Sequence, residues 1–154
     1  LYPSRKMERA EEEQVLREVC RQGGLAYASL ATRAAEGDVT AADAAHEMAW
    51  EQLHSAPWHS VHPAWRDAYS LSCLHLASAH LQLANVRDSL RVLDMGLLMG
   101  GLLLKTRILS AISEAQKQIS NADNGDAGSG GDAIQTCSEV CCKDVKLRTH
   151  AVMM

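Results

Sequence analysis

Three histidines, His54, His59 and His62, lie close together in the segment LHSAPWHSVHPAW, residues 53–65. Imidazoles that converge are good zinc ligands, but a zinc site needs three or four converging ligands with partners that orient them. The sequence has no HExxH pair and no cysteine pair at zinc-ribbon spacing. We therefore predict no metal site here, and we expect these histidines to be polar and capping residues at helix ends.

The same segment and the residues beside it carry all three tryptophans, Trp50, Trp58 and Trp65. A large ring stabilises a long connection by burying area, while its N–H finds a carbonyl, so we expect the tryptophans to fill the joint between the two flanking helices. The alternative is a partner-contact surface, in which exposed tryptophan, together with His59 and Arg66, forms a binding hot spot. Both interpretations stay open at the level of sequence.

Two further motifs contain residue types that can carry chemistry. Cys137, Cys141 and Cys142 in CSEVCC match no standard metal or redox spacing. MGLLMGG, residues 95–101, lacks the GxxxxGK[ST] spacing of a phosphate loop and follows no strand, so its GxxxG spacing favours close helix packing. No nucleophile elbow or kinase motif is present. The sequence thus predicts no catalytic, cofactor-binding or metal-binding residue.

The elements around these motifs are predicted to be helical. Alanine and leucine dominate, aromatic residues make up only 4% and phenylalanine is absent, which favours helix over a β-sandwich. Hydrophobic periodicity predicts helices over residues 4–22, 25–36, 40–53, 63–83, 86–97 and 102–119. The expected organisation is a charged N-terminal helix (1–21), a repeat-like helical domain (22–119), a flexible Gly/Asn/Asp/Ser linker (120–136) and a disordered cysteine-containing tail (137–154).

The predicted helix boundaries carry start signals. Thr40 with Asp43 forms a weak capping box, Pro63 suits the first turn of a helix, and Asn85 is a good N-cap. Residues 37–50 also align with residues 84–97 at an offset of 47, with small residues at matching positions. We predict an all-α fold of stacked helical hairpins, a short armadillo- or tetratricopeptide-like α-solenoid. Chance similarity between two alanine- and leucine-rich helices is the competing explanation.

Charge and composition limit the function classes. The net charge of -4 and pI near 6.0 give no basic footprint for nucleic acid or an anionic membrane. The longest apolar run is too short to span a bilayer, and five cysteines without a secretory signal indicate reduced thiols and an intracellular protein. Because the chain starts at Leu1 and not at methionine, we expect it to be part of a longer reading frame.

Two stretches carry a specific resemblance: AAHEMAWEQLHSAPWHSVHPAWRDAYSLSCLHLA (44–77) and SLRVLDMGLLMGGLLL (89–104). They resemble the N-terminal helical region of Jumonji-C-domain proteins of the "Jumonji domain-containing five" branch, most closely the plant members. The resemblance covers residues 22–117. It implies nuclear Fe(II)- and 2-oxoglutarate-dependent oxygenases, described as histone lysine demethylases or protein hydroxylases and linked in plants to circadian control, whose iron is held by an HxD…H triad in a C-terminal jelly roll.

This chain departs from that family at the iron site. None of its seven histidines is followed two positions later by Asp or Glu, so no residue can be assigned to iron or 2-oxoglutarate. We therefore expect an N-terminal structural and interaction domain, catalytically inert alone, whose partner is its own oxygenase domain or a nuclear protein. If the natural chain continues into such a domain, the whole protein is an enzyme. The remaining alternative is a free-standing helical-repeat adaptor that binds peptide tails in a basic groove.

Overall fold

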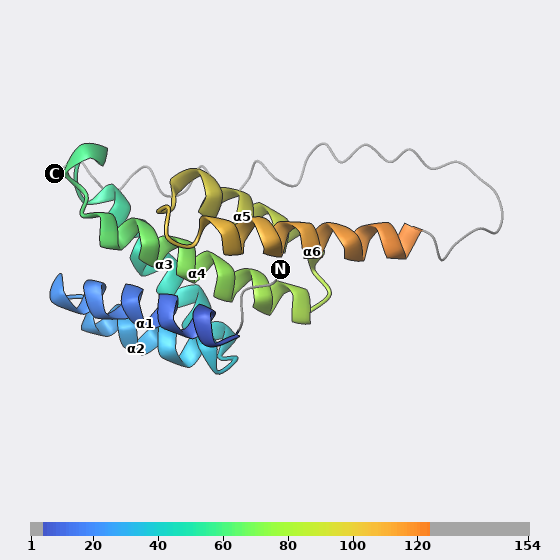
Figure 1. Ribbon diagram of the computed structural model, residues 1–154, viewed down its shortest axis with the longest axis horizontal. Helices are drawn as coiled ribbons and strands as arrows, with labels where there is room; N and C mark the ends of the chain where they lie inside the picture. Colours follow the sequence, from blue (N-terminus) through green and yellow to red (C-terminus); the bar gives the residue numbers. More distant parts are fainter. Residues whose placement is uncertain (1–4, 124–154) are drawn as a thin grey trace, which may run out of the picture.

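The computed structural model describes residues 5–123, and all its regular elements there are helical (Figure 1). They are α1 (Arg5–Arg21), α2 (Leu25–Ala35), α3 (Val39–His54), the short 3-10 helix η1 (Trp58–Ser60), α4 (Pro63–Gln82), α5 (Val86–Met99) and α6 (Lys105–Asp123). This confirms the predicted all-α class. Residues 124–136 of the expected linker, and the whole tail with Cys137, Cys141 and Cys142, lie outside the described residues.

Helix α4 is the centre of the fold. It packs most extensively against α5 and α3, and it also contacts α1, α2 and α6. In Figure 1, α1 and α2 lie on one side of α4, and α5 and α6 lie on the other. Because α4 is covered from several directions, its serines Ser70 and Ser72 are fully buried along with its apolar residues. Both hydroxyls are hydrogen-bonded, as buried polar groups require.

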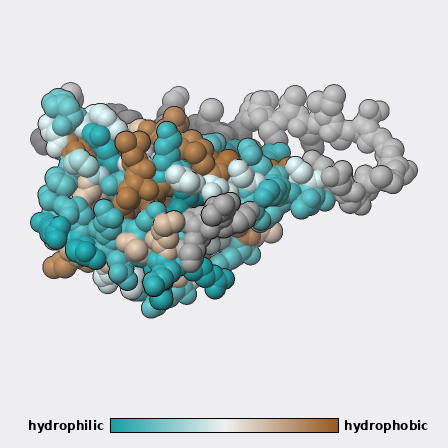
Figure 2. Space-filling model, viewed as in Figure 1, coloured by the Kyte–Doolittle hydropathy of each residue, from teal (hydrophilic) through white to brown (hydrophobic). Residues whose placement is uncertain are grey.

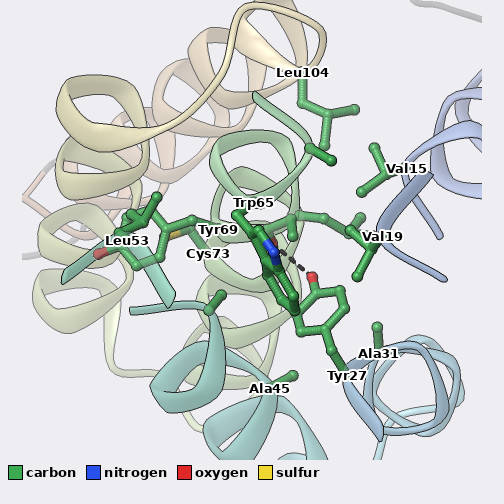
Figure 3. Packing of buried hydrophobic residues seen from close by; sticks show 14 of the residues in the cluster. Val15, Val19, Tyr27, Ala31, Ala45, Leu53, Trp65, Tyr69, Cys73 and Leu104 are labelled. Atoms are coloured by element: carbon green, nitrogen blue, oxygen red, sulfur yellow. Dashed lines mark hydrogen bonds between the residues drawn. The ribbon is translucent and has the colours of Figure 1, made fainter. Parts of the chain in front are cut away.

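The core centres on Tyr27 of α2 and Trp65 of α4, which meet edge to face with ring centroids 5.8 Å apart (Figure 3). Val15 and Val19 of α1 and Leu104 before α6 close the same cluster. Five alanines also belong to the cluster, namely Ala31, Ala45, Ala49, Ala64 and Ala68. Alanine at the contact positions lets the helix axes approach closely, so a core with few aromatic rings is still well packed.

Helices α3 and α5 begin in the same way, as the offset of 47 predicts. Each follows a residue with positive φ, Gly37 at 98° and Ala84 at 57°. Each is capped by the next side chain, since Asp38 accepts from the Ala41 amide and Asn85 from the Asp88 amide. Both helices then pack on α4. An offset of 47 lies within the roughly 40–47 residues of an armadillo repeat, so the alignment reflects a structural repeat.

Three boundary predictions need correction. Asp38 caps α3, not Thr40 with Asp43, because the Asp38 side chain reaches the Ala41 amide from the position before the helix. The last helix starts at Lys105, not at residue 102, because α4 binds the preceding backbone: Gly101 N–H donates to the Arg66 carbonyl at 3.0 Å. That helix also continues to Asp123, beyond the predicted end at residue 119.

Helix α1, which lies within the predicted charged N-terminal helix of residues 1–21, packs against the other helices. Val15 and Val19 are buried in the main cluster. Its acidic face binds α6, where Arg107 lies 2.8 Å from a carboxylate oxygen of Glu12 and 3.8 Å from one of Glu11. The Arg107 side chain is mostly buried, so this pair links the first and last helices of the described chain.

Candidate functional site

The structure separates the three tryptophans that the sequence placed in one joint. Trp65 is 9% exposed and belongs to the core, as predicted. Trp58 in η1 is 45% exposed and Trp50 on α3 is 37% exposed, so neither fills a buried joint. The correction has a physical reason. The residues of η1 are all exposed, and Trp50 lies at the edge of the contact between α3 and α4, where its ring faces Tyr69 and remains partly exposed.

Trp58 forms an exposed corner with Arg66 of α4. The guanidinium carbon of Arg66 lies 4.0 Å from the centre of the Trp58 ring, and the same guanidinium donates to the Trp58 carbonyl at 2.5 Å. A cation held over an aromatic face and tied to its backbone fixes the 3-10 turn. His59 is exposed beside it, and His62 caps α4 by accepting from the Ala64 amide through Nδ1. Thus Trp58 and Arg66 come together, and their contact orders the connection.

Trp50 belongs to a different place, a groove on α3 that we call the acidic groove. Its wall on α3 consists of Asp43, His46, Glu47, Trp50 and Glu51. Tyr69 of α4 and Met95 of α5 complete it, and the hollow has a volume of about 390 Å³. The rings form one continuous aromatic wall: the Tyr69 centroid lies 5.1 Å from that of His46 and 5.7 Å from that of Trp50.

Burial shifts the pKa values of the groove's aromatic groups. Desolvation lowers the pKa of His46 and outweighs the nearby carboxylates of Asp43 and Glu47, which act to raise it. Burial also raises the pKa of Tyr69 above its ordinary value, and raises that of the neighbouring Cys73 thiol to about 12. At neutral pH the wall is therefore uncharged, and the negative charge of the groove comes from its rim of carboxylates.

A second exposed feature, which we call the leucine surface, lies at the turn from α5 to α6. Leu98 is 74% exposed and Leu102 is 83% exposed. Figure 2 shows hydrophobic side chains gathered over this part of the molecule. The turn beneath them is held close to α4, because Gly101 N–H donates to Ser70 Oγ at 3.1 Å and Leu103 N–H donates to Asp67 Oδ1 at 3.4 Å. The two leucines are therefore presented on a fixed backbone.

No metal-binding arrangement occurs among residues 5–123. No three His, Cys, Asp or Glu side chains within that range are placed so that they could hold a metal ion. The iron ligands that the family resemblance implies therefore have no fit among the described residues. No helix in this part of the chain is long and apolar enough to cross a membrane.

Sequence reasoning missed the acidic groove, although one signal was available. Asp43, Glu47 and Glu51 follow one another at intervals of four, and His46 and Trp50 do the same. Residues four apart share a helix face, so the pattern predicts a carboxylate row beside a ring row on α3. It does not predict Tyr69 or Met95 as the opposite wall, because that depends on how α4 and α5 pack against α3.

Comparison with known proteins gives a consistent match. A family model described as "KDM8-like, N-terminal ARM repeats" matches residues 5–129, which includes the first helix that the sequence resemblance left out. The chain is 51% identical over 112 residues to lysine-specific demethylase JMJ30 of Arabidopsis thaliana, covering 70% of this chain and 26% of that protein. It is 32% identical over 72 residues to lysine-specific demethylase 8 of Xenopus tropicalis, covering 46% of this chain and 16% of that protein. No solved structure matches.

Proposed function

Because the chain belongs to the family of KDM8-like N-terminal ARM repeats, we propose that it is a helical interaction domain, inert as a catalyst, that docks a JmjC-type oxygenase domain. The matched region is about a quarter of the Arabidopsis relative and 16% of the Xenopus relative, so the demethylase activity in their names is proposed to reside outside it. A nuclear location is part of the proposal, supported by those names.

The leucine surface is the observation that carries this proposal. Two leucines that are 74% and 83% exposed cost free energy in water, and an exposed apolar cluster on a fixed turn is typical of a binding surface. The turn is held by Gly101 and Leu103 amides bound to α4, so little ordering entropy opposes docking. An intramolecular partner needs only modest affinity, because a linker supplies a high effective concentration.

The test is an isothermal calorimetric titration of the full chain with the C-terminal part of the Arabidopsis relative, the part that this chain does not match. We expect association, and we expect Leu98→Ser with Leu102→Ser to weaken it at least tenfold, since burying two leucines contributes roughly 1.5–3 kcal/mol each. Leu25→Ser with Leu83→Ser is the matched control, because both residues are strongly exposed and lie elsewhere. Equal weakening by both pairs, or no association, would contradict the proposal.

A second measurement concerns catalysis. The chain alone, supplied with Fe(II) and 2-oxoglutarate, is expected to give no succinate, because its histidines offer no HxD motif. Succinate formation above the protein-free background would overturn the non-catalytic role. The free-standing adaptor is not favoured, since the acidic groove has a rim of carboxylates, whereas capture of a peptide carboxylate needs basic side chains.

A further inference from the structure

The acidic groove has a chemistry that the proposed docking role does not use. Its three carboxylates, Asp43, Glu47 and Glu51, are all exposed. Among residues 5–123, none of them forms an ion pair with a lysine or arginine. Three like charges on two turns of one helix repel one another, so their arrangement is unfavourable for the free chain. A bound cation would relieve that repulsion.

The wall beside the carboxylates suits the same ligand. Trp50 presents a partly exposed ring that lies beside the exposed His54 ring, 4.1 Å away between centroids, and Tyr69 and His46 extend the aromatic surface inward. Aromatic faces attract cations, with tryptophan the strongest. Burial lowers the pKa of His46, so this ring stays neutral at neutral pH and does not compete as a cation. Met95 adds a flexible apolar contact at the opposite wall, which suits the methylene stem of a long side chain.

The length and volume of the groove also suit a few side chains of a bound peptide better than a large ligand. Asp43 and Glu51 are eight residues apart on α3, which corresponds to about 12 Å along the helix. That length matches three or four residues of an extended peptide. The volume of about 390 Å³ lies at the lower end of ligand pockets, which run from roughly 300 to 1,000 Å³.

We propose that the acidic groove binds a basic segment of a partner protein, with a lysine or arginine side chain lying over Trp50 and its charge between Glu47 and Glu51. Charge complementarity and the aromatic wall select this occupant over an acidic or apolar one. The inference builds on the proposed interaction role but uses a different surface from Leu98 and Leu102. Each surface therefore has its own variants, and either proposal can fail while the other holds.

The experiment is a fluorescence-anisotropy titration of the full chain with a labelled nonapeptide that carries three lysines among serines and alanines. We expect sub-millimolar binding that weakens with added salt. An otherwise identical peptide with acetyl-lysine should bind at least tenfold more weakly, because acetylation removes the charge. Glu47→Gln with Glu51→Gln should weaken the lysine peptide about tenfold, as expected for two exposed ion pairs.

The matched control is Glu13→Gln with Glu36→Gln, which makes the same change in net charge at exposed positions that form no ion pair with lysine or arginine among residues 5–123 and do not line the groove. It should leave the affinity within twofold of the unchanged chain. Trp50→Leu should lower the affinity with little effect on stability, because Trp50 is partly exposed.

Three results would overturn the proposal. Equal weakening by the two glutamine pairs would mean that binding is general attraction to a negatively charged protein. Equal binding of the acetylated peptide would mean that the positive charge plays no part. The third result is a dimer of the chain in sedimentation, together with peptide binding that weakens as the chain concentration rises. It would mean that a second copy of the chain occupies the groove.

Discussion

The helices on the two sides of α4 pack against it through different kinds of contact. On the side of α1 and α2, a pair of large rings fills the space: Trp65 meets Tyr27, whose hydroxyl donates to the Ala68 carbonyl at 2.6 Å (Figure 3). On the side of α5 and α6, glycines let the backbone approach. A Cβ added at Gly96 would lie 2.9 Å from Cys73 Cβ, and one at Gly100 would lie 2.0 Å from Ser70 Oγ.

The difference bears on the docking surface proposed above. Rings and alanines on the first side bury nearly all of their own area, so that side ends in a closed core. The second side also buries side chains, since Leu93 of α5 and Ile108 of α6 are fully buried there, but the neighbouring leucines Leu98 and Leu102 remain in solvent. Both sides therefore stabilise the domain, and the glycine-closed side also presents exposed leucines at its turn. The predictions below test this contrast, from the largest expected effect to the smallest.

Trp65→Ala should be the most damaging substitution on the ring-filled side. Removing a buried tryptophan leaves a cavity beside Tyr27 and Val19, and we expect it to lower the free energy of unfolding by about 3 kcal/mol. Urea denaturation followed by circular dichroism gives the value. Trp58→Ala is the control and should cost under about 1 kcal/mol, since the ring is 45% exposed and loses mainly its contact with Arg66. Equal losses would contradict the assignment of Trp65 to the core.

Gly100→Ala tests the glycine-closed side. The added Cβ would meet Ser70 Oγ at 2.0 Å and the Gly96 carbonyl oxygen at 2.2 Å, so the turn must move away from α4. We expect a loss of about 2 kcal/mol in the same urea experiment, the usual size of an overpacking penalty. Leu98→Ala, two residues earlier and exposed, should change the free energy of unfolding by less than about 0.5 kcal/mol. A tolerated Gly100→Ala would mean that close backbone approach does not hold this side.

Much of this fold could be predicted because its signals are local. Pro63 and Asn85 mark helix starts through their own backbone and side-chain chemistry, and the GxxxG spacing of Gly96 and Gly100 marks close approach. Thr40 was the wrong cap because Asp38, two residues earlier, is an equally good capping residue in sequence. Only the geometry of the turn after Gly37 decides between them.

The candidate sites were harder to predict because they depend on packing between helices. Nothing in the pattern around Trp58 tells whether η1 turns its ring inward or outward. Leu98 is exposed because it lies on the uncovered face of α5. Leu102 is exposed because α4 binds the Gly101 and Leu103 amides, so residue 102 lies in a turn where hydrophobic periodicity predicted the start of a helix. Periodicity reports the apolar face of an element and not what covers that face.

Tyr27→Phe should lower the free energy of unfolding by less than Trp65→Ala or Gly100→Ala, because it keeps the ring and removes one hydroxyl. That hydroxyl donates to the Ala68 carbonyl and lies 3.0 Å from Ser72 Oγ, in a fully buried position. We expect a loss of about 1 kcal/mol, since Ser72 still donates to the same carbonyl. Ser72→Ala and the double variant complete a mutant cycle, in which the coupling should reach about 0.5 kcal/mol or more. Strictly additive losses would mean that the two hydroxyls do not act together.

The N-caps of α3 and α5 should show the smallest effects. The two helices occupy equivalent places in the repeat, but a carboxylate, Asp38, caps α3 and an amide, Asn85, caps α5. Asn85→Ala should cost about 1 kcal/mol, and this cost should depend on pH less than that of an acidic cap, because the capping amide itself does not titrate and only its second contact, from Nδ2 to the Asp88 carboxylate, involves an ionisable group. Asp38→Ala should be destabilising at pH 7 but less so in acid. The Ala41 amide and then Arg33 hold the pKa of the Asp38 carboxyl below its ordinary value of 3.8, so its ionised form stabilises the folded chain above that pH.

That contribution is lost as the pH falls through the lowered pKa of Asp38, where the carboxyl gains a proton and accepts the Ala41 amide less well. Urea denaturation of both variants and the unchanged chain at pH 7, 5 and 3.5 makes the comparison. The Asp38→Ala difference should shrink at pH 3.5 by more than the Asn85→Ala difference does. Asp94→Ala, an exposed carboxylate in the middle of α5, is the control and should show neither effect. If the Asp38→Ala difference stays constant with pH, the backbone after Gly37 fixes the start of α3, and the two repeats share their turn geometry without sharing a capping mechanism.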